Sequence, residues 1–220
     1  GNPYPVPEQM SRLDMDHVIN GFVETAKGAM AAGFDGLEIH CAHGYLLNQF
    51  LSSYSNQRED EYGGSIENRF RFVREVIEAV RQVVPGDRLL VVRISNWGIA
   101  DMDVSLFGDS QEWQEMVRLF SATPIDGISV STYDYNEKAF GTDKTMAELT
   151  RQATDLPLMI CGKIHDRESA DQALSHADLV LAGKSMLLNP DWVQGLAASK
   201  KMKAYSSDEA GIAYTDTPLP

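Results

Sequence analysis

Residues 33–45 have the sequence Gly-Phe-Asp-Gly-Leu-Glu-Ile-His-Cys-Ala-His-Gly-Tyr. The first part predicts a short buried strand over 35–40, and the second part predicts a loop that carries two histidines and a tyrosine. Proteins that alternate strands and helices place their chemistry where strands end in clustered polar side chains. This stretch therefore predicts a strand-end site, and the rest of the chain is expected to supply its scaffold.

Helix and strand patterns alternate along the chain on both sides of this strand. Apolar residues at helical spacing predict a helix over 13–30, with Asp14 or Asp16 as its N-cap and Gly33 as its stop signal. Four more strands are predicted at 89–95, 126–131, 158–161 and 178–181. Helices are predicted at 65–84, around 113–120, at 144–154, at 166–175 and within 184–199. Residues 41–64 are expected to form a long polar loop.

Alternation of this kind predicts a parallel sheet. A doubly wound sheet normally has a glycine-rich dinucleotide turn after its first strand, whereas the segment Cys41-Ala42-His43-Gly44 has one glycine. Polar residues at the strand ends favour a (βα)₈ barrel instead. Such a barrel needs eight strands and typically about 250 residues. This chain, with five predicted strands in 220 residues, therefore predicts a partial barrel.

Composition excludes several classes of protein. The formal net charge of −13 argues against nucleic acid or an anionic membrane as partner, because both require clustered lysine and arginine. No apolar run is long enough to span a bilayer, and the first residues do not resemble a signal peptide. The chain has two cysteines, Cys41 and Cys161, too few for a disulfide framework. A reduced, cytoplasmic protein is therefore expected.

The residues His40, His43 and Tyr45 are the first candidates for chemistry. A single histidine is often structural, and a His-x-x-His pair can chelate zinc, but no third ligand lies nearby in the sequence. Imidazoles that donate hydrogen bonds to a carbonyl or anionic oxygen fit a strand-end loop better. Tyr45 could then supply a proton. The sequence therefore favours an oxygen-binding site without metal.

Arg93 is the second candidate, because it lies within an apolar strand where an unpaired charge is costly. Strand parity places Glu38 and His40 on one face and Arg93 and Ser95 on one face. If the two strands are neighbours, Arg93 can form an ion pair with Glu38. The alternative is that its guanidinium faces an electron-rich ligand.

Two Gly-Lys pairs form the third candidate. Gly162-Lys163 and Gly183-Lys184 each follow one of the last two predicted strands. In barrels the corresponding loops commonly bind phosphate through glycine amides, and lysine acts there as a point charge. The repetition at equivalent strand ends predicts a phosphate site.

Residues 33–52 and 56–69, together with Val92-Arg93-Ile94-Ser95, 160–164 and 188–191, resemble the Old Yellow Enzyme family of NAD(P)H-dependent FMN oxidoreductases. The similarity covers nearly the whole chain. It implies an eight-stranded barrel that binds FMN, passes hydride from NAD(P)H through the flavin, and reduces an activated alkene or another electron-poor acceptor.

The resemblance also implies roles for individual residues. His40 and His43 would bind the activating oxygen of the substrate, and Tyr45 would donate the proton. Arg93 would lie at the N1/O2 edge of the flavin. The residues implied to hold the FMN phosphate are Gly162, Lys163, Gly183 and Lys184. Family members usually carry glycine at the position of Lys163 and arginine at that of Lys184, so a bidentate guanidinium contact is lost here.

Alignment by these motifs assigns residues 1–199 to strands 4–8 of the family barrel, with 200–220 as a polar C-terminal tail and the first three βα units absent. Strands 35–40 and 178–181 would then be unpaired edges. We expect the chain to bind a complementary segment or to self-associate as a homo-oligomer. Two rival hypotheses remain: a non-catalytic assembly module, and a flavin-free barrel that binds a phosphate ester.

Overall fold

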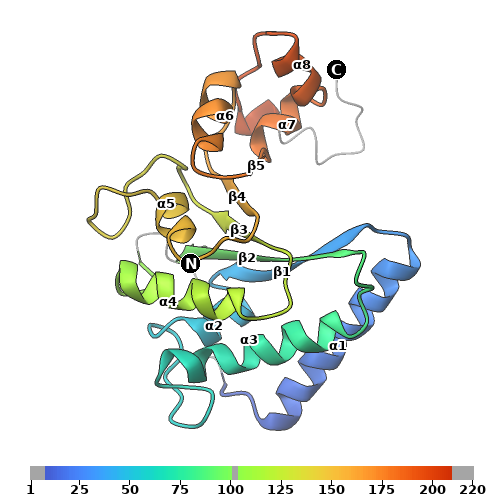
Figure 1. Cartoon of the computed structure of the whole chain (residues 1–220), viewed down its shortest axis with the longest axis vertical. Helices are drawn as coiled ribbons and strands as arrows, with labels where there is room; N and C mark the ends of the chain where they lie inside the picture. Colours follow the sequence, from blue (N-terminus) through green and yellow to red (C-terminus); the bar gives the residue numbers. More distant parts are fainter. Residues whose placement is uncertain (1–7, 101–103, 210–220) are drawn as a thin grey trace.

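The computed structural model describes residues 8–100 and 104–209. Its five strands form one sheet, entirely parallel, in the order β1-β2-β3-β4-β5 (Figure 1). The strands are β1 Gly36–His43, β2 Leu89–Gly98, β3 Gly127–Ser131, β4 Leu158–Cys161 and β5 Leu179–Leu181. This arrangement confirms the predicted parallel sheet. The edges of the described sheet are β1 and β5, as the sequence predicts.

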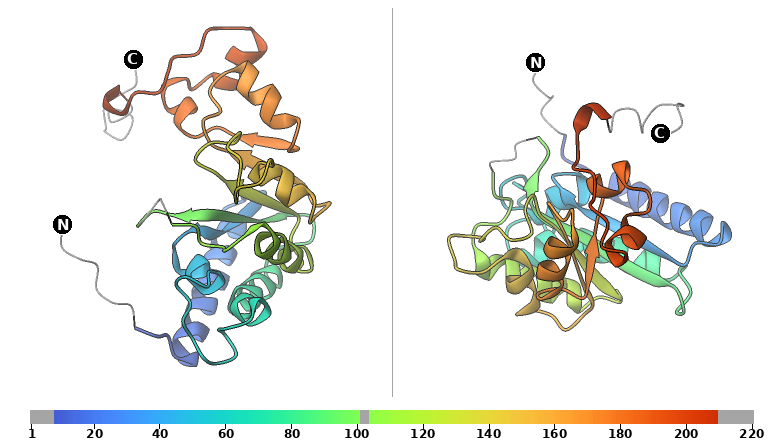
Figure 2. Two further views of the ribbon diagram at one scale, coloured as in Figure 1. Left: turned by 90° about the vertical axis from the view of Figure 1, so that its left-hand side faces the viewer. Right: turned by 90° about the horizontal axis from the view of Figure 1, so that it is seen from above.

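Eight helices connect and cover these strands in the described part of the chain. They are α1 Arg12–Ala31, α2 Leu46–Leu51, α3 Ile66–Arg81, α4 Ser110–Ser121, α5 Met146–Arg151, α6 Arg167–Leu174, α7 Lys184–Leu188 and α8 Trp192–Ala197. Helices α3 to α6 lie along one side of the sheet (Figure 2). Among the described residues, no helix is both long and apolar enough to cross a membrane.

Three local predictions are wrong. The segment 41–64 is not a continuous loop, because β1 continues to His43 and α2 follows. The N-cap of α1 is Ser11, whose hydroxyl accepts from the amide of Asp14 while the carboxylate of Asp14 accepts from the amide of Ser11. Asp14 is thus the third helical residue of a capping box rather than the cap itself. The last predicted helix is divided into α7 and α8.

The end of α1 shows how the sequence places β1. Gly33 has φ +86°, a left-handed conformation that glycine adopts without strain. Its amide donates to the carbonyl of Met30, and the amide of Phe34 donates to the carbonyl of Ala29. This pair of bonds is a Schellman motif, and it turns the chain directly into the strand.

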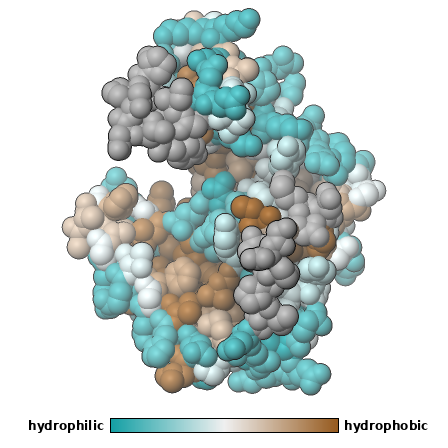
Figure 3. Space-filling view, turned by 180° about the vertical axis from the view of Figure 1, so that it is seen from behind, coloured by the Kyte–Doolittle hydropathy of each residue, from teal (hydrophilic) through white to brown (hydrophobic). Residues whose placement is uncertain are grey.

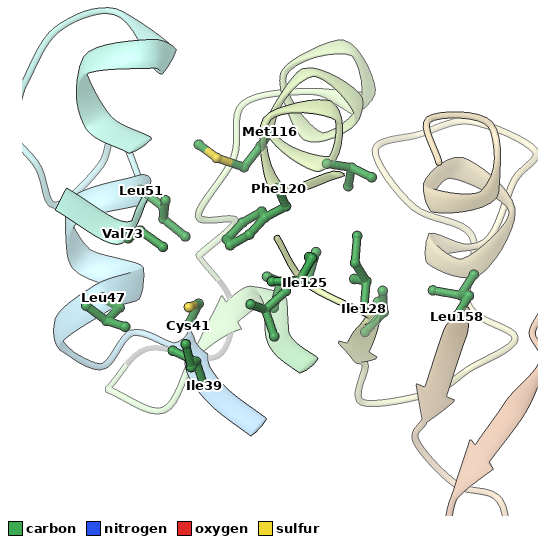
Figure 4. Packing of buried hydrophobic residues seen from close by; sticks show 14 of the residues in the cluster. Ile39, Cys41, Leu47, Leu51, Val73, Met116, Phe120, Ile125, Ile128 and Leu158 are labelled. Atoms are coloured by element: carbon green, nitrogen blue, oxygen red, sulfur yellow. The ribbon is translucent and has the colours of Figure 1, made fainter. Parts of the chain in front are cut away.

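The two faces of the sheet differ in their cover. One face packs on the helices through Ile39, Val92, Ile128 and Leu158, each at most 4% exposed. Figure 4 shows part of this core, with Ile39 and Cys41 of β1 near Leu47, Leu51 and Val73 of α2 and α3. The other face corresponds to the interior of a barrel. Strand register places His40, Arg93, Ser129 and Met159 in one row across it. Because successive side chains along a strand point to opposite faces, the core residues lie on one face of the sheet and the candidate site residues on the other.

Apolar surface remains beside the edge strand β1. Only Met15 and Ala26 of α1 are fully buried, although its apolar residues follow helical spacing over its whole length. Val18, Ile19 and Phe22 are only partly buried against the core. On the face seen in Figure 3, hydrophobic residues gather in the middle and are bordered by hydrophilic ones. Contiguous exposed apolar surface of this kind is typical of an interaction site.

Candidate functional site

The structure brings together the three predicted residues at the end of β1. The ring centroids of His40 and His43 lie 5.0 Å apart, and those of His40 and Tyr45 lie 5.5 Å apart. Tyr45 is the N-cap residue of α2, so the helix that the sequence prediction missed is the element that positions it. Its side chain is half-exposed, whereas both histidines are partly buried. The cluster therefore presents two imidazoles and a phenol on one surface.

His43 has an unusual backbone conformation, with φ +63°. The pairing of β1 with β2 shifts register between Cys41 and His43, as at a β-bulge, which turns the side chain to a new direction. The amide of His43 donates to Ser95 Oγ at 2.8 Å, and its ring stacks on Trp97 at a centroid distance of 4.3 Å. Left-handed backbone in a non-glycine residue costs free energy and is common at functional sites.

Residues that the sequence analysis did not assign to the site hold this ring in place. His43 Nε2 lies 2.8 Å from Ser131 Oγ, and Trp97 Nε1 donates to the backbone carbonyl of Ser131 at 3.1 Å. Ser131 is the last residue of β3 and is 4% exposed. Its strand-end position was available in the sequence as a signal, but the stacking partner Trp97 became recognisable only from the structure.

Arg93 forms the ion pair that the sequence offered as one interpretation, and the alternative, a contact with an electron-rich ligand, stays a prediction. Its Nη1 donates to Glu38 Oε1 at 3.2 Å, which is the ion pair expected from strand parity, and its Nη2 donates to Cys161 Sγ at 3.1 Å. Its Nε is buried and has no hydrogen-bond partner among the described residues. Ser129, paired with Arg93 in register, has a buried hydroxyl that likewise lacks a partner there. Orphaned buried groups on the inner face indicate a missing polar ligand.

Both imidazoles are neutral at physiological pH. Burial, together with the positive charge of Arg93, lowers the pKa of His40, and Glu38 opposes this shift. Burial, then His40 and Arg93, lowers the pKa of His43 to about 4. A neutral imidazole carries one N–H donor and one acceptor nitrogen. The site is therefore suited to donate hydrogen bonds to a substrate oxygen without a full positive charge.

The low pKa of His43 predicts that the chain loses stability in acid. Between pH 6.5 and about pH 4 the unfolded chain binds a proton at this residue that the folded chain does not. The free energy of unfolding should therefore fall as the pH falls through this window, by up to about 1.4 kcal/mol per pH unit. Urea unfolding of wild type and of His43→Gln at several pH values measures this slope, which we expect to be smaller in the variant. Parallel curves for the two proteins would contradict it.

The predicted phosphate residues lie at the ends of β4 and β5, which are neighbours in the sheet. Gly162 has φ +126°, and a Cβ there would lie 2.6 Å from the carbonyl oxygen of Thr132. A Cβ on Gly183 would meet nothing within 4 Å. Lys163 Nζ forms an ion pair with Asp134 at 3.1 Å, and Lys184 Nζ lies over the ring of Tyr205. Both ammonium groups therefore have partners, and a shared phosphate contact stays a prediction.

The predicted tail is described in part. Lys203 exchanges two backbone hydrogen bonds with the side chain of Asn189, at 2.8 and 3.0 Å, so residues near 203 are fastened to the segment between α7 and α8. Residues 210–220 lie outside the described part of the chain. Within the described residues, no three histidine, cysteine or acidic side chains are placed to hold a metal.

Comparison with known proteins identifies the family. The family described as "NADH:flavin oxidoreductase / NADH oxidase family" matches residues 2–203, and this chain belongs to it. The chain is 35% identical to an NADPH dehydrogenase of Geobacillus thermodenitrificans, covering 96% of this chain and 61% of the relative. It is also 35% identical to a probable flavin mononucleotide-dependent alkene reductase of Leishmania infantum, covering 99% of this chain and 59% of the relative.

Solved structures show the same relationship. The Old Yellow Enzyme homologue of Zymomonas mobilis superimposes with a TM-score of 0.83 and 27% identity, over all of this chain and 63% of that chain. Morphinone reductase in complex with tetrahydroNAD gives a TM-score of 0.81 and 26% identity, over 99% of this chain and 59% of that chain. The chain thus spans about three fifths of these relatives. The predicted family, partial barrel and FMN- and NAD(P)H-dependent class are confirmed.

The residues present fit a flavin. The orphaned Arg93 Nε offers a donor to an electron-rich ring edge, and Ser129 adds a hydroxyl on the same row of the sheet. At the ends of β4 and β5, Gly162 packs against Thr132 and Gly183 has open space where a Cβ would lie, and glycine amides at strand ends commonly bind phosphate oxygens. These residues would hold the ring edge and the phosphate of FMN.

Proposed function

We propose that this chain supplies the substrate side and part of the flavin side of an FMN-dependent NAD(P)H oxidoreductase that reduces activated alkenes or other electron-poor acceptors. One observation carries the proposal: His40, His43 and Tyr45 converge at the end of β1, beside an arginine with an unpartnered buried N–H. FMN, when bound, accepts hydride from NAD(P)H and supplies it to the acceptor.

The proposed roles follow from the chemistry of these groups. His40 and His43, both neutral, donate hydrogen bonds to the oxygen that activates the acceptor and so stabilise the negative charge that develops there. Tyr45 donates a proton to the carbon that does not receive hydride. Arg93 binds the ring edge of the cofactor and stabilises its reduced form. Lys163, Lys184 and the two glycines before them bind its phosphate.

We further propose that a complementary segment of the same barrel covers the apolar surface beside β1. The partly buried side chains of Val18, Ile19 and Phe22 on α1 support this proposal, as does the free edge of β1. The chain matches these relatives over about three fifths of their length, and the remaining two fifths is the source that we propose for the complementary segment. Association of two copies through the same surface is the alternative.

Flavin retention tests the function. The chain is purified alone and together with the preceding segment of the Geobacillus relative, mixed with FMN, and freed of excess flavin by gel filtration. We expect bound flavin absorbance and NADPH oxidation in the combined sample. Absence of both, in a sample whose two pieces elute together, would contradict the catalytic proposal and favour a non-catalytic module.

Arg93 of β2 and Arg88, just before the start of β2, supply a matched pair of substitutions. Arg93→Met removes the proposed flavin contact, and we expect FMN affinity to fall at least about tenfold, the loss typical of a charge-assisted hydrogen bond. Arg88 pairs with Asp35 at the opposite end of the same two strands, so Arg88→Met alters a similar ion pair away from the site. Equal FMN affinity in Arg93→Met and wild type, with a phosphate ester still bound, would favour a flavin-free phosphate-binding barrel.

A further inference from the structure

A chain of hydrogen bonds connects Arg93 to His43 across the inner face of the sheet. Arg93 Nη2 lies 3.1 Å from Cys161 Sγ, Cys161 Sγ lies 3.5 Å from Ser131 Oγ, and Ser131 Oγ lies 2.8 Å from His43 Nε2. The four residues come from β2, β4, β3 and β1, so the chain joins the proposed flavin side of the site to the proposed substrate side. Neither Cys161 nor Ser131 has a role in the function proposed above.

The direction of these bonds follows from the chemistry of Arg93. Guanidinium can only donate, so the sulfur of Cys161 accepts the first bond. The thiol hydrogen of Cys161 has two acceptors within reach, Ser131 Oγ at 3.5 Å and the carbonyl of Val130 at 3.9 Å, and the serine oxygen is the nearer. Once Ser131 Oγ accepts this bond, its own hydrogen is available for His43 Nε2. In this arrangement Cys161 and Ser131 each accept one hydrogen bond and donate their own hydrogen to the next residue, so the bonds run from Arg93 through Cys161 and Ser131 to His43.

We propose that Ser131, oriented by Cys161, holds His43 as the tautomer with the proton on Nδ1. Nε2 then accepts from the serine, and Nδ1–H is the donor that His43 presents to a substrate oxygen. In the reverse tautomer Ser131 Oγ would accept from both Cys161 and His43 Nε2, and among its recorded partners its own hydrogen would have only a sulfur that already accepts from Arg93. Ser131 is thus a positioning residue. The statement about substrate rests on the proposed function, but the statement about the tautomer does not.

The surroundings of His43 leave room for this assignment. Its ring lies edge-on to that of His40 and stacks on that of Trp97, the charge of Arg93 acts on it, and Glu38 pairs with Arg93. Trp97 Nε1 donates to the backbone carbonyl of Ser131. Because Trp97 also stacks on His43, this bond fixes the backbone of Ser131 relative to the His43 ring. Ser131 is 4% exposed, so water competes little for the hydroxyl.

Nitrogen NMR tests the tautomer directly. The chain is labelled with ¹⁵N-histidine, and the His43 signals are assigned by their loss in His43→Gln. In wild type at pH 7.5 we expect a protonated Nδ1 and an unprotonated Nε2, which resonates far downfield. In Ser131→Ala we expect the Nδ1–H preference to be lost. A protonated Nε2 in the wild-type spectrum would by itself overturn the proposal.

Two substitutions of Cys161 distinguish the effect of its hydrogen bond to Ser131 from the effect of its packing. Cys161→Ser keeps a hydrogen that can be donated to Ser131, so it should retain the wild-type tautomer. Cys161→Ala removes it and should behave partly like Ser131→Ala. Unfolding curves show whether each variant folds. A tautomer that is unchanged in folded Ser131→Ala would overturn the positioning role even if the wild-type tautomer is as expected.

The consequence for substrate is measured in the complete flavoprotein. Ser131→Ala should raise the KM for an α,β-unsaturated ketone about five- to tenfold, because the hydrogen bond from His43 is no longer oriented, with NADPH-dependent flavin reduction unchanged. If the enzyme shows no alkene reduction at all, the proposed function fails while the NMR result still decides the tautomer. If alkene reduction is normal and KM does not change, the positioning role toward substrate fails.

Discussion

Replacement of Tyr45 by phenylalanine is expected to lower the rate of alkene reduction at least about 100-fold in the complete flavoprotein, the usual contribution of a positioned general acid. The phenol lies at the start of α2, 5.5 Å from His40 between ring centroids, and is half-exposed. Phenylalanine keeps the ring and removes the hydroxyl group, and with it the proton to be donated. Because NADPH transfers hydride to the flavin without this proton, flavin reduction should keep its rate. Stopped-flow measurement of the two half-reactions separates these effects.

Tyr54 provides the matched control for this substitution. It is 63% exposed, and only its backbone groups form hydrogen bonds in the structure, so Tyr54→Phe removes a phenol outside the cluster. We expect wild-type rates in both half-reactions. If Tyr45→Phe also reduces the acceptor at the wild-type rate, then Tyr45 is not the proton donor, and solvent or another group supplies the proton. Slow flavin reduction in Tyr45→Phe would show that the ring positions the cofactor instead.

Replacement of Gly162 by alanine is expected to lower the free energy of unfolding by about 3 kcal/mol. Two costs combine: the backbone has φ +126°, which L-residues rarely adopt, and the new Cβ would lie 2.6 Å from the Thr132 carbonyl oxygen. Thr132 is itself bonded to the backbone of Cys161, so it cannot easily move away. Thermal unfolding should show a midpoint lower by about 6 to 12 °C.

Two other glycines distinguish the causes of this loss. Gly141 has φ +67° but open space where a Cβ would lie, so Gly141→Ala measures backbone strain alone, about 1 kcal/mol. Gly183 follows the neighbouring strand and has neither a positive φ nor a close neighbour, so Gly183→Ala should leave the unfolding midpoint unchanged. If all three variants unfold alike, the close approach to Thr132 does not constrain Gly162.

Local patterns predicted most elements of the fold because their signals lie within a few residues. Gly33 ends α1, Ser65 caps α3 as expected, and apolar runs mark the buried strands. The missed helix α2 has six residues and no capping side chain before it, because its N-cap is Tyr45. Its pattern is therefore too short to be recognised within a polar segment. Ser11 was missed as a cap because Asp14 and Asp16, nearer the apolar stripe, offered the same chemistry.

The sequence alone determined the family, the parallel sheet and the residue types of the site, because long motifs and strand parity are properties of consecutive residues. Strand parity allowed Arg93 to pair with Glu38 if the two strands were neighbours, and the register and the ion pair show that they are. Only the tertiary structure decided that Trp97 stacks on His43 and that Cys161 and Ser131 connect it to Arg93. Those contacts join residues 30 to 88 positions apart, through strand pairing that no local pattern encodes.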